Sequence, residues 1–228
     1  MAAETRAPLD LAEVEPLAPP PGFTDALAAV GAPVSEAMLS SLGAYLAGLL
    51  AMNTRMNLTS VREPEAAWSR HILDSLTLLP QLEGVASGGH LIDVGSGGGL
   101  PAIPIAIARP DLHVTMVEST KKKARFLRAI SESLGLSRVR VKGERAEQLH
   151  GSMAGRFDIA TARAVARLSQ LVPLTAPFVK RGGRLLLIKG QRAPEELADA
   201  AKTLRRARAK HVETVLSPTG RVVVLQKE

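Results

Sequence analysis

The chain has 228 residues, 46% of them hydrophobic and 22% charged, which is typical of a soluble globular protein with one domain and an appendage, or two small domains. It contains no cysteine, which excludes a disulfide framework, a thiolate nucleophile and a cysteine-ligated zinc or iron–sulfur site. The net charge is +7, but residues 1–36 hold one arginine against six acidic residues, so the remaining 192 residues carry +12. This basic body predicts an anionic partner, either nucleic acid or an anionic membrane surface.

Two further classes are excluded by the same inspection. No stretch reaches the roughly 18–20 uncharged apolar residues of a membrane span, and the N-terminus lacks the basic and apolar regions of a secretory signal. Aromatic residues make up only 3%, which argues against a wide stacking platform for single-stranded bases. We therefore expect a cytoplasmic protein without a membrane partner.

The N-terminal third is expected to be helical after an irregular start. Residues 1–23 are rich in alanine, proline and acid, and we expect a disordered or extended tail. Apolar residues then recur at three- and four-residue spacing and predict an amphipathic helix over about 35–53. A second helix is opened by Pro64 and stopped by Pro80. We expect residues 24–88 to form a small helical subdomain.

From residue 90 onward, short apolar runs alternate with helical patterns, which is typical of βαβ units and a mostly parallel sheet. A turn over 217–220 separates the last two runs and predicts a C-terminal antiparallel hairpin. Residues 89–228 are therefore expected to form an α/β domain with a Rossmann-like, twisted sheet. The expected strands cover about 90–94, 112–117, 139–142, 157–161, 185–189, 212–216 and 222–225, and the expected helices about 101–108, 121–134, 144–149, 168–178 and 194–208.

The sharpest motif is a glycine-rich loop, residues 95–99, between a buried strand and a helix opened by Pro101. Glycines allow a tight turn and close approach of a ligand, and the amides of a helix N-terminus attract an anionic group. Glu118 ends the next strand, 19 residues after Gly99. In nucleoside-binding sheets an acid at this point accepts hydrogen bonds from ribose hydroxyls. Strand, loop, helix, strand and acid in this order predict a nucleoside-containing ligand.

Two nucleoside ligands compete for this loop. Gly97, Gly99 and Ala102 fit the dinucleotide fingerprint, which would indicate a nucleotide-dependent oxidoreductase. The first glycine after the strand is Gly95, however, and Asp93 followed by alternate glycines fits the methyltransferase pattern better. Asp93 would repel a pyrophosphate but could fix the loop or the cationic methionine end of S-adenosylmethionine. The loop favours a methyltransferase; a turn without a ligand and an RNA-binding module that keeps the fold stay open.

Over about residues 40–228 the chain resembles the glucose-inhibited-division B (RsmG) family of bacterial 16S ribosomal RNA guanine-N7 methyltransferases. The glycine loop alone would indicate only the methyltransferase superfamily, whereas the His-x-Leu-Asp-Ser, Arg-Ala-Glu and Lys-Gly-Gln segments are specific to this family. Ala102 departs from the family, which often has glycine there, and Glu118 stands where aspartate is also common. The resemblance rests on residues 57–61, 71–76, 92–101, 123, 126–127, 145–147, 163–164 and 189–191.

The resemblance implies a class I methyltransferase fold, S-adenosylmethionine as cofactor and the 16S ribosomal RNA of the small subunit as partner. It implies that Gly95 lines the cofactor pocket, that Glu118 holds the ribose and that Ala146 and Glu147 flank the adenine. Arg163 is expected at the mouth of the pocket, near the methionine end or the target base. The full set of expected cofactor-binding residues is Asp93, Gly95, Ser96, Gly97, Gly99, Leu100, Glu118, Ser119, Ala146, Glu147 and Arg163.

The reaction implied by the resemblance requires no proton transfer from the reacting nitrogen. Guanine N7 carries a free lone pair and no proton, so its methylation by in-line displacement needs neither a general base nor a metal, and we expect catalysis by positioning. The target base must leave its stack, which is easiest in an RNA loop. Because the product guanine is cationic, Arg163 is favoured as a binder of carboxylate or phosphate. The expected RNA contacts are Asn57, His71, Lys121, Arg125, Arg163, Lys189 and Gln191.

Structural roles compete with several of these assignments. His71 and Asp74 could form a local hydrogen bond between the helices and the sheet, and Asn57 could fix its own loop. Lys121 and Arg125 could belong to a solvated helix face. We expect the protein to be a monomer.

Overall fold

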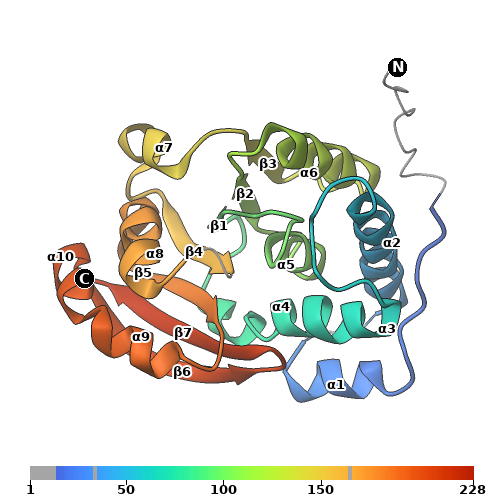
Figure 1. Cartoon of the computed structure of the whole chain (residues 1–228), viewed down its shortest axis with the longest axis horizontal. Coiled ribbons are helices and arrows are strands. Elements are labelled where there is room, and N and C mark those ends of the chain that lie inside the picture. Colours follow the sequence, from blue (N-terminus) through green and yellow to red (C-terminus); the bar gives the residue numbers. More distant parts are fainter. Residues whose placement is uncertain (1–13, 33–34, 164–165) are drawn as a thin grey trace, which may run out of the picture.

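A seven-stranded sheet with the order β3-β2-β1-β4-β5-β7-β6 forms the centre of the computed structural model, which describes residues 14–32, 35–163 and 166–228 (Figure 1). The strands from β3 to β5 run parallel, and β7 lies antiparallel between β5 and β6. The mostly parallel sheet and the C-terminal hairpin predicted from the sequence are thus confirmed. The strands are β1 (His90–Val94), β2 (His113–Val117), β3 (Val139–Lys142), β4 (Phe157–Arg163), β5 (Val179–Lys189), β6 (Ala209–Ser217) and β7 (Gly220–Lys227).

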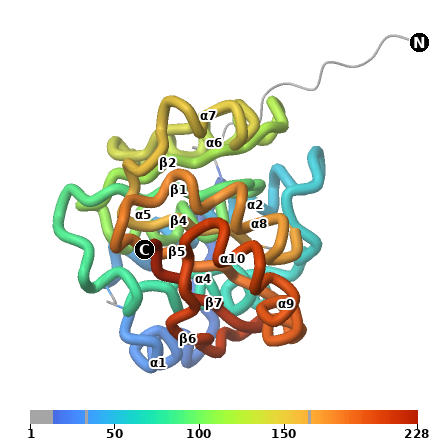
Figure 2. The backbone as a smooth tube through the Cα atoms, turned by 90° about the vertical axis from the view of Figure 1, so that its left-hand side faces the viewer, coloured from blue at the N-terminus to red at the C-terminus, as the bar shows by residue number. Residues whose placement is uncertain are grey.

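Helices cover both faces of the sheet, because alternate residues of each buried strand point to opposite sides. Leu91 belongs to a core that also includes residues of α1, α2, α5 and α6, whereas its neighbour Ile92 packs with residues of α7, α8 and α10. Seen from the side, α6 and α7 lie at one end of the molecule, and α1 and β6 lie at the other (Figure 2). The α-helices are α1 (Phe23–Ala29), α2 (Glu36–Asn53), α3 (Pro64–Ala67), α4 (Asp74–Leu76), α5 (Ala102–Ala108), α6 (Lys121–Ser133), α7 (Ala146–Met153), α8 (Leu168–Thr175), α9 (Ala193–Asp199) and α10 (Ala201–Ala207).

The N-terminal helices form a layer on the sheet. Trp68 and Leu46 are fully buried in the same hydrophobic cluster as Val114 of β2, so the helices of residues 24–88 share one continuous core with the sheet. The helix predicted from Pro64 onward is present but irregular, since residues Trp68–Leu73 form a π-helix between α3 and α4. Such segments occur often at functional sites, and no sequence periodicity distinguishes them from an α-helix.

Residues 1–13 of the predicted tail lie outside the described residues, but its remainder packs against α2. The backbone amide of Leu17 donates to the carbonyl oxygen of Gly43 at 3.2 Å. A Cβ atom on Gly43 would lie only 2.3 Å from the carbonyl oxygen of Leu17, so glycine is needed for this close approach. The segment from residue 14 is therefore irregular, as predicted, but it is fixed to the helical layer.

The predicted helices and strands are all present, and the differences lie at their ends. Ser35 caps α2 at the predicted start of this helix, because its hydroxyl accepts from the amide of Met38 at 3.2 Å. β5 begins at Val179, six residues earlier than predicted, and the predicted helix over 194–208 is divided into α9 and α10. None of the helices formed by the described residues is long and apolar enough to cross a membrane.

Candidate functional site

The glycine-rich loop joins β1 to α5 at the carboxyl ends of the strands, next to the point where the chain order of the sheet reverses. In open α/β sheets ligands bind in the crevice at this point. Gly95, Gly97 and Gly99 have φ values of 77°, 57° and 100°, a region that favours glycine. The amides of Gly95 and Ser96 both donate to the carbonyl oxygen of Val117, at 2.9 and 3.1 Å, and tie the loop to the end of β2.

A tyrosine of α2 supports the loop from the side of the helical layer. The buried Tyr45 hydroxyl donates to the carbonyl oxygen of Gly98 at 2.9 Å, and burial raises the pKa of Tyr45 far above its usual value, which keeps it a neutral donor. A Cβ atom on Gly98 would lie 2.7 Å from Leu49 of the same helix. The contact joins residues 53 positions apart, so sequence analysis could not find it.

Replacing Tyr45 with phenylalanine should lower both stability and cofactor affinity. The Gly98 carbonyl would remain buried without its donor, which costs about 1–3 kcal/mol in the free energy of unfolding. We expect a several-fold weaker binding of S-adenosylhomocysteine as the loop loosens. Urea unfolding and calorimetry measure the two effects, with Ser41→Ala, which removes an exposed hydroxyl from the same helix, as the control. Equal values for the two variants would show that the hydrogen bond does not support the loop.

Asp93 lies beneath the loop and is fully buried. The Thr161 hydroxyl donates to its Oδ1 at 2.7 Å, its Oδ2 has no hydrogen-bond partner among the described residues, and burial raises its pKa to about 7. Of the two roles expected for Asp93, the structure supports fixing of the loop, since Ser96 Oγ donates to its backbone carbonyl at 3.1 Å. The expected contact with the methionine end of a cofactor is not supported, because Asp93 lines neither of the two pockets that open beside the loop and are described next. Gly99 also lines neither of them.

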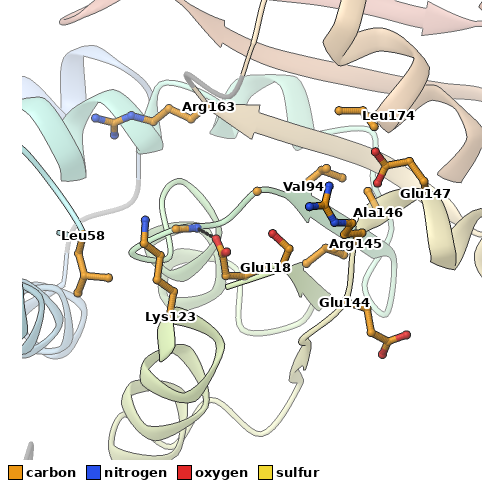
Figure 3. A pocket seen from close by; sticks show the side chains of 14 residues that line it. Leu58, Val94, Glu118, Lys123, Glu144, Arg145, Ala146, Glu147, Arg163 and Leu174 are labelled. Carbon is orange, nitrogen blue, oxygen red and sulfur yellow. Dashed lines mark hydrogen bonds between the residues drawn. The ribbon is translucent and has the colours of Figure 1, made fainter. Parts of the chain in front are cut away.

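A pocket of about 520 Å³, here called the larger chamber, opens beside the loop, and its volume lies within the range of small-molecule sites. Figure 3 shows Glu118 in its middle, with Lys123 and Arg163 on one side and Arg145 and Glu147 on the other. Its lining includes seven of the predicted cofactor-binding residues: Gly95, Gly97, Glu118, Ser119, Ala146, Glu147 and Arg163.

Glu118 combines a structural role with free acceptor capacity. Its Oε2 accepts from the amide of Gly97 at 3.0 Å, and its Oε1 accepts from the amide of Thr120 at 2.7 Å. The residue is only 7% exposed, yet it lines the chamber. Because each carboxylate oxygen has two acceptor positions, the pair can still accept one hydrogen bond each, as a cis diol requires. The predicted ribose contact therefore fits the geometry.

Lys123 lines the larger chamber and was not among the predicted site residues. A signal for it exists in the sequence, because Lys121, Lys122 and Lys123 occupy the first turn of α6. Cations are unfavourable near a helix N-terminus, so three of them together indicate a role outside the helix. Lys121 and Arg125 are exposed and line neither chamber.

A second pocket of about 270 Å³, here called the smaller chamber, adjoins the first and shares Leu58, Gly95, Gly97 and Arg163 with it. The two chambers are thus parts of one site. The predicted residues Ser96, Leu100 and His71 line this chamber and not the larger one. Its remaining lining residues are Thr59, Ser60, Val61, Arg70, Gly98 and Thr219.

A chain of hydrogen bonds runs from Arg163 to the wall of the smaller chamber. Arg163 Nη2 donates to the carbonyl oxygen of Arg70 at 3.1 Å and lies 3.2 Å from His71 Nδ1. Arginine cannot accept, so Nδ1 carries the lone pair and His71 Nε2 carries the hydrogen, which is donated to Thr59 Oγ1 at 2.7 Å. The amide of Val61 donates to the same oxygen at 3.0 Å. With both lone pairs of Oγ1 occupied, the Thr59 hydroxyl can only act as a donor toward the chamber.

The groups around these hydrogen bonds keep the imidazole of His71 neutral. Burial, with a further contribution from Arg163, lowers the pKa of His71 to about 4. Arg163 Nη1 lies 3.7 Å from Oδ2 of Asp74, which is fully buried and accepts at Oδ1 from the amide of Thr219 at 3.2 Å. The alternatives for His71 thus combine: it is held by local hydrogen bonds and also faces a chamber.

The expectation that Lys189 faces RNA is corrected by the structure. Lys189 is only 8% exposed, its Nζ donates to the carbonyl oxygen of Ala166, and it forms an ion pair with Glu196 at 2.9 Å. Glu196 in turn accepts from the amide of Leu168 at 3.0 Å. A buried lysine needs such partners, so this one is engaged in holding the segment that follows β4.

Two other expected RNA contacts lie outside both chambers. Gln191 is exposed at the end of β5. Asn57 is exposed beside a separate depression, and its loop is shaped by Asn53, whose Oδ1 accepts from the amides of Leu58 and Thr59 at 2.8 and 2.9 Å. These two side chains are available to a macromolecule and not to a ligand in the site.

The strand order, the terminal antiparallel hairpin and the glycine loop facing a strand-end acid are those of the class I methyltransferase fold. A protein from Corynebacterium glutamicum has this fold with a TM-score of 0.56 and 18% identity, over 81% of this chain and 89% of its own. Geranyl diphosphate methyltransferase, solved with GPP and sinefungin, has a TM-score of 0.53 and 14% identity, over 68% and 77% of the two chains.

Sequence comparison defines the family within this class. The model of the family described as rRNA small subunit methyltransferase G (GidB) matches residues 38–223. The ribosomal RNA small subunit methyltransferase G of Sorangium cellulosum is 57% identical over 228 residues, which cover 100% of this chain and 95% of the relative. The chain belongs to this family, as the resemblance seen in the sequence implied.

Proposed function

We propose that this enzyme transfers the methyl group of S-adenosylmethionine to N7 of one guanine in the 16S ribosomal RNA of the small subunit. Family membership supports the reaction. The Thr59 hydroxyl, which can only donate a hydrogen bond into the smaller chamber, supports guanine as the target base. Guanine presents two acceptors, N7 and O6, on one edge, whereas adenine presents N7 beside an amino donor. A donor at Thr59 therefore matches guanine O6 and opposes the amino group of adenine.

The residues of the larger chamber fit the proposed cofactor. Glu118 would hold the ribose hydroxyls, the Ala146–Glu147 segment would contact the adenine, and Lys123 would pair with the carboxylate of the methionine part. When bound, S-adenosylmethionine supplies an electrophilic methyl group on a positively charged sulfur. The Glu118 carboxylate, which is buried and still has acceptor positions directed at the chamber, is the observation that supports this fit.

The chain's own residues orient the base and keep unfavourable charge away from it. Guanine N7 has no proton to lose, so no side chain needs to act as a general base. A guanine methylated at N7 is cationic, and His71 adds no charge beside it because its pKa is lowered to about 4. The guanidinium of Arg163 is directed to Asp74, to the Arg70 carbonyl and to His71. The chamber thus holds the reacting base by hydrogen bonds and enclosure.

The RNA would approach across the exposed basic side chains at the start of α6. Lys121, Lys122 and Arg125 are exposed in the first turns of α6, the helix that also carries Lys123 of the larger chamber. We propose that they contact phosphates, which position the RNA without reading its sequence. The target base would leave its stack to enter the smaller chamber, as a base in an RNA loop can do readily. A ribosomal substrate places this reaction in the cytoplasm.

The decisive test is methyl transfer to small-subunit RNA that lacks the modification. RNA or subunits from cells without the gene are incubated with the protein and S-adenosylmethionine, and mass mapping should find one new N7-methylguanosine. Absence of transfer, with a thermal shift by S-adenosylhomocysteine, would indicate another substrate. A thermal shift by NAD alone would indicate an oxidoreductase, and RNA binding without any cofactor shift a binding module.

Replacing Thr59 with valine tests the base contact. Valine keeps the shape but removes the donor, so we expect kcat/KM for RNA to fall by about 10–100-fold, as for other lost hydrogen bonds in a buried site. S-adenosylhomocysteine affinity should be unchanged, because Thr59 does not line the larger chamber. Thr59→Ser, which keeps the hydroxyl, should retain near-normal transfer. Equal transfer by the valine and serine variants would rule out a hydrogen bond from this residue to the base.

A further inference from the structure

We propose that a basic hollow at the opposite end of the sheet binds one phosphate and the adjoining base of the RNA substrate. The hollow has a volume of about 410 Å³, and the proposal rests on the proposed function, because it adds a second contact to the same substrate. The residues that line it are His90, His113, Val114, Thr115, Arg138, Arg140, Met153, Arg156 and Phe157.

The hollow lies where the short helix α7 leaves the sheet uncovered. His90, His113 and Phe157 are the first residues of β1, β2 and β4, so the hollow is at their amino ends, whereas both chambers are at their carboxyl ends. α7 ends at Met153, which forms part of the rim. Strands of five residues span about 17 Å, a distance that about five stacked nucleotides of one strand cover. An RNA segment that enters a chamber would need at least this many nucleotides to continue to the hollow.

The lining of the hollow is positively charged, and one of its arginines, Arg138, donates from Nη1 to the backbone carbonyl oxygen of Asp111 at 2.9 Å. Arg138, Arg140 and Arg156 are exposed, no carboxylate lines the hollow, and none of the three forms an ion pair within the described ranges. The two aspartates nearby have other partners: Asp111 pairs with Arg109 at 2.8 Å, and Asp158 pairs with Lys180. Like charges gathered around one hollow repel each other and oppose compact folding, so the fold alone does not account for this cluster. Guanidinium groups match the geometry of a phosphate.

Flat rings beside the arginines favour RNA over other phosphate ligands. His90 and His113 are paired across β1 and β2, and their rings stack with centroids 5.0 Å apart and planes 17° apart. Phe157 meets His90 edge to face, with ring centroids 6.4 Å apart. Unstacked RNA bases bind on such rings, while a free phosphate or a lipid headgroup has no use for them. Phosphate-binding arginines and a stacking surface together describe one nucleotide of a single strand.

The test compares two triple variants that lose the same charge. R138Q/R140Q/R156Q removes the arginines of the hollow, and K202Q/R205Q/R206Q removes three exposed cations of α10. Affinity for 16S RNA is measured over a range of salt concentrations, together with S-adenosylhomocysteine binding and the kinetics of methyl transfer. We expect the hollow variant to lose about tenfold in affinity at low salt and about 0.7–0.9 in the slope of log K against log salt, since one phosphate contact is lost and each contributes roughly that much. The KM for RNA should rise with kcat and cofactor affinity unchanged.

A second variant separates stacking from charge. H90A/H113A should weaken RNA binding several-fold without changing the salt slope, because ring stacking releases no counterions. Equal losses of RNA affinity in the hollow variant and the control variant would overturn the proposal. A hollow variant that binds naked RNA normally but assembled subunits weakly would also overturn it, because the hollow would then contact a ribosomal protein. A wild-type protein that binds S-adenosylhomocysteine but no RNA would refute the proposed function itself.

Discussion

Replacing Asp93 with asparagine should change how the stability of the protein depends on pH. Burial raises the pKa of Asp93 from 3.8 to about 7, so between these values the folded protein holds a proton that the unfolded chain has released. The free energy of unfolding contributed by this group therefore falls as pH rises through the window and is constant above it. The asparagine variant lacks this loss. From pH 5 to pH 8 its stability relative to wild type should rise by about 2–3 kcal/mol.

Urea unfolding of both proteins at several pH values measures this difference. Asparagine keeps an acceptor for the Thr161 hydroxyl, and its second side-chain atom has no partner, as Oδ2 of Asp93 has none among the described residues of the wild type. Any pH-independent difference in the free energy of unfolding cancels when only the pH dependence is compared. Asp111→Asn is the matched control. Its hydrogen bond from Arg109 lowers the pKa of Asp111, so its effect should be flat between pH 5 and 8. A flat profile for the Asp93 variant as well would mean that this carboxyl group is ionised throughout.

Replacing Glu118 with glutamine should weaken the binding of S-adenosylhomocysteine by about 100-fold or more. Each hydrogen bond to a charged group is worth about 1.5–3 kcal/mol, and two ribose hydroxyls would lose such an acceptor. The amide nitrogen would also face the backbone amide of Gly97 or that of Thr120, both of which now donate to the carboxylate. Calorimetric titration measures the affinity, and a 2′-deoxyribose analogue of the ligand should lose much less affinity on substitution.

Glu144→Gln provides the control for this variant. Glu144 lines the same chamber, is exposed, and has the same charge, so its substitution should change affinity by no more than about threefold. If the two glutamine variants bind alike, Glu118 contributes only through the charge of the pocket. If Glu118→Gln lowers affinity equally for the ribose and deoxyribose ligands, its role is confined to the loop, and another group holds the ribose.

The parts of the site that follow from sequence are those built from adjacent residues. A glycine loop after a buried strand and an acid at the end of the next strand meet because parallel strands end at the same edge of a sheet. The sequence therefore predicts that Gly95, Gly97 and Glu118 lie together, and they line one chamber. The strands and helices followed from hydrophobic periodicity in the same way. Their ends shifted where packing or a π-helix, as in Trp68–Leu73, overrides local preference.

What sequence could not provide are contacts between distant segments and the burial of charged groups. Tyr45 supports Gly98 only because α2 packs on the loop, and no local pattern marks a tyrosine on an apolar helix face for that role. Lys189 looked available to RNA because strand ends border ligand crevices, but Glu196 from α9 folds back onto it. The hydrogen bond of Arg163 with His71 joins positions 92 apart, so neither residue alone indicates which tautomer the histidine adopts.

The order of lining residues along the chain has a consequence for synthesis on the ribosome. The larger chamber is lined by residues up to Leu174, whereas the smaller chamber also requires Thr219, whose amide donates to Asp74 at the turn between β6 and β7. Domains fold as the chain emerges from its N-terminal end. The smaller chamber is therefore the last part of the site to be completed. A chain truncated before its final hairpin would keep every side chain that lines the larger chamber, but its smaller chamber would lack Thr219.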